Sequence, residues 1–416
     1  MTISVAAPQA YGKKANDVIF GANDAAVKAA QKYGKEKVTN ATIGAILDEN
    51  EELVCLPTVE KVYRGLSMRD VIQYAPIAGL SDFLTEVQNR CFGAYRPAAE
   101  IAAVATAGGT GGIHNTIHNY TEWGDEVLTS DWYWGAYSVL CNDNGRKLRT
   151  FRLFTDDLQW NQDDFAQHVE AIAERQDQVL VILNTPAHNP TGYSLSDEDW
   201  QQALGTLKEV AARPEKHVIL LVDVSYLDFA GDEETSRSFF RHFENLPENL
   251  LVVVCYSMSK GFTMYGQRIG AMIGITSSPQ IAQEFKDINQ YTSRATWSNI
   301  NRAGMQALVT ISQDAKLLQQ FQAEQAEYFA LIRDRAALFM QEAAEVELPV
   351  LPYRAGFFLS VPSRDSKAVC ALMNRDNIFP VPLKAGVRLA VCAVTKAKMP
   401  GIATKLKAAW EQVEHA

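Results

Sequence analysis

A lone lysine and a lone arginine stand in a small, apolar segment near the middle of the chain. The segment from Tyr256 to Gly270 reads YSMSKGFTMYGQRIG, and Lys260 and Arg268 are its only charged residues. It overlaps the end of the apolar run LLVVVCYS. A lysine at the end of a buried strand loses hydration, which lowers the pKa of its amine and makes the neutral form a usable nucleophile. The pattern suggests a covalent role for Lys260, such as a Schiff base with an aldehyde. The alternative is a surface loop carrying two cations.

Pyridoxal phosphate is an aldehyde cofactor whose other requirements can be sought elsewhere in the chain. Its phosphate needs an arginine, hydroxyls and free backbone N–H groups, its pyridine nitrogen an acid, its phenolic oxygen donors, and its ring a flat surface. Four further segments offer such groups: AGGTGGIHNTIHNY, SDWYWGAYSVL, NTPAHNPTGY and VDVSYLDFA. The first is a glycine-rich turn that opens a helix, and such a turn presents backbone N–H groups to an anion.

The lysine segment resembles a known family. SMSKGFTMYGQR, from Ser257 to Arg268, is similar to the cofactor-lysine segment of the class I aminotransferases, the aspartate aminotransferase family of fold-type I pyridoxal phosphate enzymes. The resemblance implies that Lys260 carries the cofactor and that Ser257 and Arg268 hold its phosphate. It also implies that Lys260, once freed, is the catalytic base and acid that moves the substrate proton.

The other four segments follow the family's order, and each implies a cofactor contact. By this resemblance the glycine-rich turn is the phosphate cup, AHNPTG and VDVSY carry donors to the phenolic oxygen, and WG carries the stacking ring. The implied residues are Gly108, Gly109 and Thr110 for the cup, Asn189 and Tyr226 for the phenolic oxygen, Asp223 for the pyridine nitrogen, and Trp134 for the ring. Many members have a serine where Gly108 stands, which would remove one phosphate contact here.

Each segment also has a purely structural interpretation. The glycine-rich turn could be an ordinary strand-to-helix turn, Asp223 a helix cap and Trp134 part of a core aromatic cluster. Five segments in the right order favour the cofactor site. His114 and His118 have the spacing of a metal pair, but no acidic or third ligand accompanies them. We therefore expect no metal site there, and a covered helix face instead.

Two further motifs predict contacts with the substrate. An amino-acid carboxylate suits arginine, which can give it two parallel hydrogen bonds. AGVRLAV resembles the family's carboxylate-binding strand and implies Arg388, while NATIGA resembles the segment that closes over the substrate and implies Gly44. The alternative for Arg388 is a strand arginine that faces solvent.

Two motifs imply a homodimer with active sites at the subunit interface. SRATWSNINRAG resembles the segment whose arginine reaches a substrate side-chain carboxylate in the other subunit, which implies Arg294. YAPIAGL resembles the segment that reaches the neighbour's phosphate, which implies Tyr74. Trp297 stands where the family usually has tyrosine, and the prolines after the asparagine are absent. A helix-boundary arginine without a substrate role is therefore the alternative for Arg294.

The elements that must position these residues predict an α/β fold. Seven short apolar runs lie between about residues 100 and 276: IAAVAT, EVLTS, LRTFRLF, QVLVIL, HVILLVDV, LLVVVCYS and RIGAMIGI. Helical patterns separate several of them, so we expect a large domain with a mostly parallel, seven-stranded sheet covered by helices. After Asn301 one or two long helices and the shorter runs GFFLSV, NIFPVP and VRLAVCAV predict a smaller α+β domain formed by the N- and C-terminal parts. We place the divisions at residues 1–52, 53–305 and 306–416.

Composition excludes several other classes. The 416 residues carry a net charge of -10, whereas nucleic-acid binders present a basic face. Six cysteines without a C-x-x-C pair fit a reduced compartment, and the first residues lack a signal-peptide pattern. The apolar run NLLVVVCY is too short to span a bilayer. We expect a cytoplasmic protein that binds neither nucleic acid nor membrane.

The function implied by the resemblance is transamination. The expected enzyme moves an amino group from an amino acid (aspartate, glutamate or an aromatic one) to a 2-oxo acid such as 2-oxoglutarate. One alternative is another pyridoxal phosphate reaction on the same fold, such as that of a β-lyase or a decarboxylase. A second is a non-catalytic ligand sensor, but the basic helix pair that such regulators carry ahead of this region is missing from the sequence.

Overall fold

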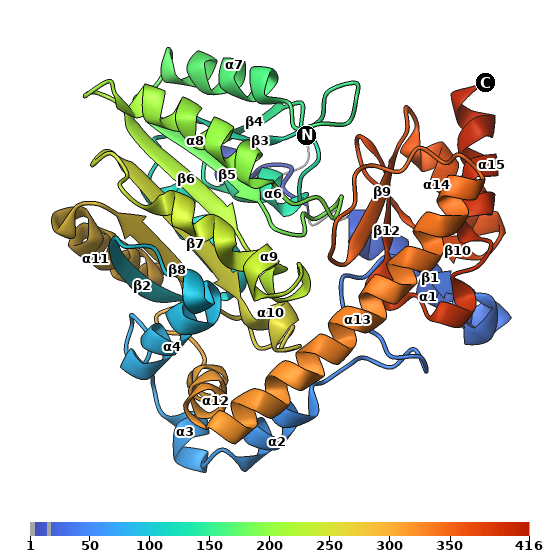
Figure 1. The fold of residues 1–416 in the computed structure, drawn as a ribbon, viewed down its shortest axis with the longest axis horizontal. Helices are drawn as coiled ribbons and strands as arrows, with labels where there is room; N and C mark the ends of the chain where they lie inside the picture. The colour runs from blue at the N-terminus through green and yellow to red at the C-terminus, as the bar shows by residue number, and fades with distance from the viewer. Residues whose placement is uncertain (1–4, 15–17, 416) are drawn as a thin grey trace.

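A seven-stranded sheet organises most of the molecule (Figure 1). The computed structural model describes residues 5–14 and 18–415. The strands, in spatial order, are β2 (Glu100–Ala107), β8 (Ile269–Thr276), β7 (Leu250–Ser257), β6 (His217–Asp223), β5 (Gln178–Asn184), β3 (Glu126–Ser130) and β4 (Lys147–Phe151). Neighbours are parallel except that β8 runs antiparallel to both β7 and β2. The predicted seven-stranded, mostly parallel sheet is therefore confirmed.

Helices cover both faces of this sheet. The face of α5 (Gly108–Asn119) also carries α6 (Ala136–Asp143) and α11 (Pro279–Thr296). The opposite face carries α4 (Ser81–Phe92), α7 (Gln162–Ala173) and α8 (Asp197–Ala211). Successive side chains of a strand point to opposite faces. Accordingly, Ile219 and Leu221 of β6 pack with the α5 side, whereas Val218, Leu220 and Val222 pack with the other. Two covered faces explain why the runs are apolar at nearly every position.

A second group of elements joins the two ends of the chain. A three-stranded antiparallel sheet has the order β11 (Val381–Pro382), β12 (Gly386–Ala390), β9 (Phe358–Pro362). Beside it, β1 (Thr39–Asn40) pairs in parallel with β10 (Ile378–Phe379). The helices here are α1 (Val18–Tyr33), α14 (Ser366–Arg375) and α15 (Ile402–Glu414). The N-terminal part thus packs with the C-terminal part.

One long helix runs between the two groups. In Figure 1, α13 (Ala315–Glu345) extends from α2 (Pro57–Gly65) and α12 (Arg302–Gln313) towards α15. The short helices are α3 (Met68–Ile72), α9 (Glu233–Arg237) and α10 (Met258–Gly261). The divisions at residues 52 and 305 stay a prediction, and residues 1–4, 15–17 and 416 of the terminal units lie outside the described residues.

Several elements end earlier than their apolar runs. LRTFRLF leaves the sheet after Phe151, where the backbone N–H of Leu153 turns to the carboxylate of Asp131, 3.0 Å away. NIFPVP divides into β10 and β11 at Pro380, which has no N–H to donate. VRLAVCAV ends as a strand at Ala390 and continues as the 3₁₀ turn η6 (Val391–Ala393).

The long helical pattern after Asn301 forms two helices. Asp314 divides them, because its carboxylate accepts from the backbone N–H groups of Lys316 and Leu317 and so caps α13. None of the helices in the described part of the chain combines the length and apolar composition needed to cross a bilayer.

Candidate active site

The carboxyl ends of three parallel strands meet at one edge of the large sheet. Strands β5, β6 and β7 end in Asn184, Asp223 and Ser257, and Asn184 lies beside Asp223 in the strand register. The antiparallel β8 begins at this edge, so Gly270 pairs with Ser257. Ligands of open α/β sheets bind outside the carboxyl ends of the strands. The topology therefore brings the predicted cofactor residues together.

A cavity of about 130 Å³ opens at this edge. Its lining contains nine of the residues predicted from the sequence: Gly109, Thr110, Trp134, Asn189, Asp223, Tyr226, Ser257, Lys260 and Arg268. Four lining residues were not predicted: Ile113, Asn184, Ser225 and Ser259. Gly108 does not line the cavity but is buried at the start of α5, one residue before Gly109.

Lys260 sits in α10, the turn that immediately follows β7. Its Nζ donates to the carbonyl oxygen of Gly44, 2.8 Å away, and lies 5.0 Å from the ring centroid of Tyr265. Loss of hydration is the largest effect on this amine and lowers its pKa to about 8. Arg268 and Arg388 act in the same direction, because a nearby positive charge disfavours a second one. Lys260 is therefore a usable nucleophile near neutral pH.

Asp223 is a buried carboxylate with neutral donors around it. One oxygen accepts from the hydroxyl of Ser225 at 2.6 Å and from its backbone N–H, while the other accepts from the hydroxyl of Tyr137 at 2.7 Å. Burial raises the pKa of Asp223, and these hydrogen bonds oppose the rise because they favour the charged form. A cation placed beside this carboxylate would supply its missing counter-charge.

Asn189 and Tyr226 lie together between Asp223 and Arg388. The side-chain nitrogen of Asn189 donates to the Tyr226 hydroxyl at 3.4 Å, and its oxygen accepts from Arg388 Nη1 at 3.2 Å. The backbone N–H of Asn189 donates to Asn184 Oδ1 at 2.6 Å, so the end of β5 holds the turn. One amide thus connects Tyr226 with Arg388.

The opposite end of the cavity is suited to an anion. Arg268 donates from Nη1 to Ser259 Oγ at 3.4 Å and from Nη2 to Thr110 Oγ1 at 3.5 Å, beside the N-terminus of α5. Arg268 has a φ of 58°, a strained value for a non-glycine residue. Gly108 has a φ of 67°, and a Cβ there would lie 2.7 Å from Arg268 Nη2. Glycine at position 108 therefore leaves room for the guanidinium.

Arg388 is almost fully buried, with 2% of its surface exposed. Its Nη2 donates to the carbonyl oxygen of Thr42 at 2.6 Å, and its guanidinium lies 4.2 Å from the ring centroid of Phe358. A strand arginine facing solvent is thus excluded. Gly44 contacts Lys260 through its carbonyl, and a Cβ at Gly44 would lie 2.6 Å from the Phe358 ring. Both residues lie near the lysine, and their contact with substrate stays a prediction.

Two predicted residues lie exposed on the surface and do not line the cavity of their own chain. Tyr74 is 85% exposed and lines a separate surface hollow with Arg302. Arg294 is exposed at the end of α11 and donates to the hydroxyl of Ser298. Their predicted roles therefore require a second subunit.

Three histidines near the predicted cofactor residues, His114, His118 and His188, do not line the cavity. His114 and His118 stack with ring centroids 5.8 Å apart, and His118 is exposed, so this helix face is only partly covered. Within the described residues no group of three metal-binding side chains was found. His188 is buried with its Nδ1 2.8 Å from Thr191 Oγ1, and burial lowers its pKa to about 3. It supports the turn that carries Asn189.

Pyridoxal phosphate fits the arrangement of these groups. Arg268, the hydroxyls and the helix N-terminus would hold its phosphate, Asp223 its ring nitrogen and Lys260 its aldehyde. The glycines at the cup leave space for it, since a Cβ at Gly109 would lie 3.2 Å from Ser225 Oγ. Ser225 and Tyr137 were not predicted from the sequence. Ser225 nevertheless lies two residues after the predicted Asp223, and Tyr137 lies three residues after the predicted Trp134.

Comparison with known proteins identifies the family. The family described as aminotransferase class I and II matches residues 36–406. Two mitochondrial aspartate aminotransferases are similar over most of their length. The Xenopus tropicalis protein is 24% identical over 72% of this chain and 69% of its own. The Gallus gallus protein is 25% identical over 70% and 68%.

Solved structures show the same fold. A crystal structure of an aminotransferase from Anaerococcus prevotii has a TM-score of 0.96 and 36% identity, covering 98% of this chain and 100% of that one. An aromatic-amino-acid aminotransferase from Burkholderia pseudomallei, covalently bound to pyridoxal phosphate, has a TM-score of 0.80 and 21% identity, covering 97% and 100%. At that identity the second likeness concerns the fold alone.

Proposed function

The chain belongs to the class I and II aminotransferases and is a pyridoxal phosphate-dependent amino-acid aminotransferase, and from this premise we propose that the cavity beside Lys260 is its active site. One observation carries the proposal. A single cavity joins a partly desolvated lysine, a buried carboxylate and an arginine with hydroxyl partners.

The residues around the cavity would divide the work between them. When bound, the cofactor supplies an aldehyde that receives the amino group and a ring that accepts electron density from the substrate carbon. Ser257, Thr110 and Arg268 would bind its phosphate, and Trp134 would cover one face of its ring. Ionised Asp223 would hold a proton at the ring nitrogen, while Asn189 and Tyr226 would donate to the phenolic oxygen.

Lys260 would also be the catalytic base. A pKa of about 8 leaves roughly a tenth of the amine neutral at pH 7, compared with almost none for an ordinary lysine. Its Nζ would take the proton from the substrate Cα and would then donate that proton to the cofactor's C4′ carbon. A positioned base of this kind contributes about 10²- to 10⁴-fold in rate.

The substrate is proposed to be a dicarboxylic or aromatic amino acid, with 2-oxoglutarate as the acceptor. Arg388 would bind the α-carboxylate, with Gly44 beside it, and burial under Phe358 would strengthen this contact. Arg294 from a second subunit would bind a side-chain carboxylate. The aspartate aminotransferases among the relatives support this choice.

A homodimer in the cytoplasm completes the proposal. The exposed Tyr74 and Arg294 support dimerisation, because each would acquire a role only at the neighbour's cavity. All six cysteines are free, as expected in a reducing compartment. Analytical ultracentrifugation and localisation of the tagged chain would test these two points.

A panel of amino donors with 2-oxoglutarate tests the proposed substrates. The expected result is glutamate formed in equal amount to the new oxo acid, with aspartate or an aromatic amino acid as the best donor. Formation of pyruvate and ammonia, or of carbon dioxide, without glutamate would instead indicate the lyase or decarboxylase alternative.

A further inference from the structure

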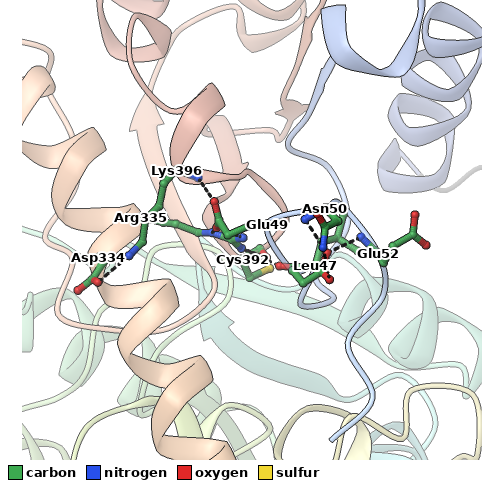
Figure 2. A network of polar contacts seen from close by, with 9 residues as sticks. Leu47, Glu49, Asn50, Glu52, Asp334, Arg335, Cys392 and Lys396 are labelled. Carbon is green, nitrogen blue, oxygen red and sulfur yellow. Dashed lines mark hydrogen bonds and ion pairs between the residues drawn. The ribbon is translucent and has the colours of Figure 1, made fainter.

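Arg335 on α13 is a buried cation that no contact described so far explains. None of its surface is exposed. Its Nε donates to Glu49 Oε1 at 3.0 Å, and its Nη1 donates to the carbonyl oxygens of Leu47 at 2.9 Å and Cys392 at 2.8 Å (Figure 2). Burying a guanidinium is costly unless its donors find acceptors. This arrangement therefore needs all three partners in place.

The acceptors of Arg335 belong to the two segments that carry Gly44 and Arg388, the residues proposed to bind the substrate carboxylate. Leu47 lies three residues after Gly44, and Cys392 lies four residues after Arg388. The backbone N–H of Leu47 also donates to Cys392 O at 3.1 Å, so the two segments meet under the guanidinium. The backbone N–H of Lys396 donates to the second oxygen of Glu49 at 3.0 Å and closes the network.

The segment before Leu47 is held at several backbone groups. Ala41 O accepts from the Ala390 N–H at 2.8 Å, and Thr42 O accepts from Arg388 at 2.6 Å. The Ile46 N–H donates to the Tyr265 hydroxyl at 2.9 Å. Leu47 is thus the last of a series of anchored residues, and its bond to Arg335 helps to fix the path of the segment that carries Gly44.

The other part of α13 contacts the turn that carries Lys260. Gln325 Nε2 donates to the carbonyl oxygen of Gly261 at 2.8 Å, and the Phe321 ring packs on Phe262 with centroids 4.4 Å apart. Gln325 and Arg335 are ten residues apart in one uninterrupted helix, which is about 15 Å along its axis.

We propose that α13 sets the spacing between the Lys260 turn and the carboxylate-binding segments, with Gln325 and Arg335 as its positioning residues. The inference rests on the proposed function, because it takes Arg388 and Gly44 as the carboxylate site. A helix suits this task, since its backbone hydrogen bonds resist stretching. The spacing matters because a displacement of about 1 Å at reacting groups can cost 10²-fold in rate.

The two positioning residues are expected to affect different measurements on the holoenzyme. Arg335→Met should weaken binding of an α-methyl amino acid, which lacks the Cα proton and cannot react, by about tenfold. KM for the amino donor should rise with it, while the cofactor dissociation constant stays within about twofold. Gln325→Ala should raise the cofactor dissociation constant about threefold to tenfold and leave binding of the α-methyl amino acid unchanged.

Matched variants separate positioning from general damage. Lys396→Ala removes only an ion pair of Nζ with Asp334, 2.9 Å long and about two-fifths exposed on each side, so both dissociation constants should be unchanged. Glu49→Gln keeps the size of the side chain but removes its charge and one of its two acceptor oxygens, which accept from Arg335 and from the Lys396 N–H. It should weaken binding of the α-methyl amino acid by a smaller factor than Arg335→Met and leave the cofactor dissociation constant unchanged. It carries the test if Arg335→Met does not fold.

Two results would overturn the inference. One is equal loss of cofactor and analogue affinity in Arg335→Met and in Glu49→Gln. The other is unchanged analogue affinity in both. Arg388→Lys, measured in parallel, shows which proposal has failed. If this variant also leaves binding of the α-methyl amino acid unchanged, the proposed carboxylate site is wrong. If it weakens that binding as expected, only the role of α13 is overturned.

Discussion

The cofactor side of the cavity is built from neighbouring strands, whereas the substrate side is built from remote segments. Asn184, Asp223 and Ser257 end adjacent strands of one sheet, so backbone register fixes their separation. Arg388 instead meets Thr42 across 346 residues, and side-chain hydrogen bonds hold this contact.

The difference indicates how rigid each side is. Sheet hydrogen bonds are numerous and cooperative, so loss of one side chain leaves the cofactor residues in position. The substrate side has fewer backbone hydrogen bonds between its segments and relies in addition on charged ones, such as those of Arg388 and Arg335. Substitutions on the cofactor side should therefore remove chemistry, while those on the substrate side should change affinity. Four experiments test this contrast, from the largest expected effect to the smallest.

Lys260→Ala should abolish the cofactor's bond to the protein and lower kcat by roughly 10⁴-fold or more, because it removes both nucleophile and base. Absorbance spectroscopy and mass spectrometry of the reconstituted protein check the first effect. Added cofactor mass that survives borohydride reduction and denaturation of this variant would show that another lysine holds the cofactor.

Arg388→Lys should raise KM for every amino donor roughly 10- to 100-fold, since an ammonium cannot give the carboxylate two parallel hydrogen bonds. The cofactor absorbance should stay as in the wild type, because the residue belongs to the substrate side. Steady-state kinetics with several donors measures the effect, and an unchanged KM would remove Arg388 from the site.

Arg294→Ala should lower kcat/KM for aspartate about tenfold and leave phenylalanine within about twofold, because only aspartate has a second carboxylate to pair. The comparison of the two donors is its own control. Equal loss for both would mean that Arg294 supports the fold or the dimer and does not contact the side chain.

The rate at which the apoenzyme captures pyridoxal phosphate should rise about tenfold from pH 6 to 7 and level off above pH 8. Only the neutral amine attacks the aldehyde, and the lowered pKa of Lys260, about 8, sets the pH at which that form predominates. A lysine with its usual pKa of 10.5 would give a capture rate that still rises above pH 9. Stopped-flow absorbance distinguishes the two profiles.

Local sequence patterns were sufficient for the sheet, and the family resemblance predicted nine of the residues that line the cavity. An apolar run followed by a polar residue predicts a strand end, and the topology places such ends together, as with Asp223 and Ser257. The apolar runs overestimated strand length where the backbone N–H groups bond a side chain or form a 3₁₀ turn instead of pairing in the sheet, as after Phe151 and Ala390. A hydropathy run records burial, and burial continues past the last ladder hydrogen bond.

The sequence by itself determined which residues could do chemistry: a lysine after an apolar run, an aspartate at the end of another such run, and an arginine eight residues beyond the lysine. Only the tertiary structure decided that Tyr137 and Ser225 donate to Asp223, that Gly44 faces Lys260, and that Arg335 joins Leu47 to Cys392. The reason is physical: local patterns report burial and backbone conformation, whereas contacts between distant segments depend on how whole elements pack.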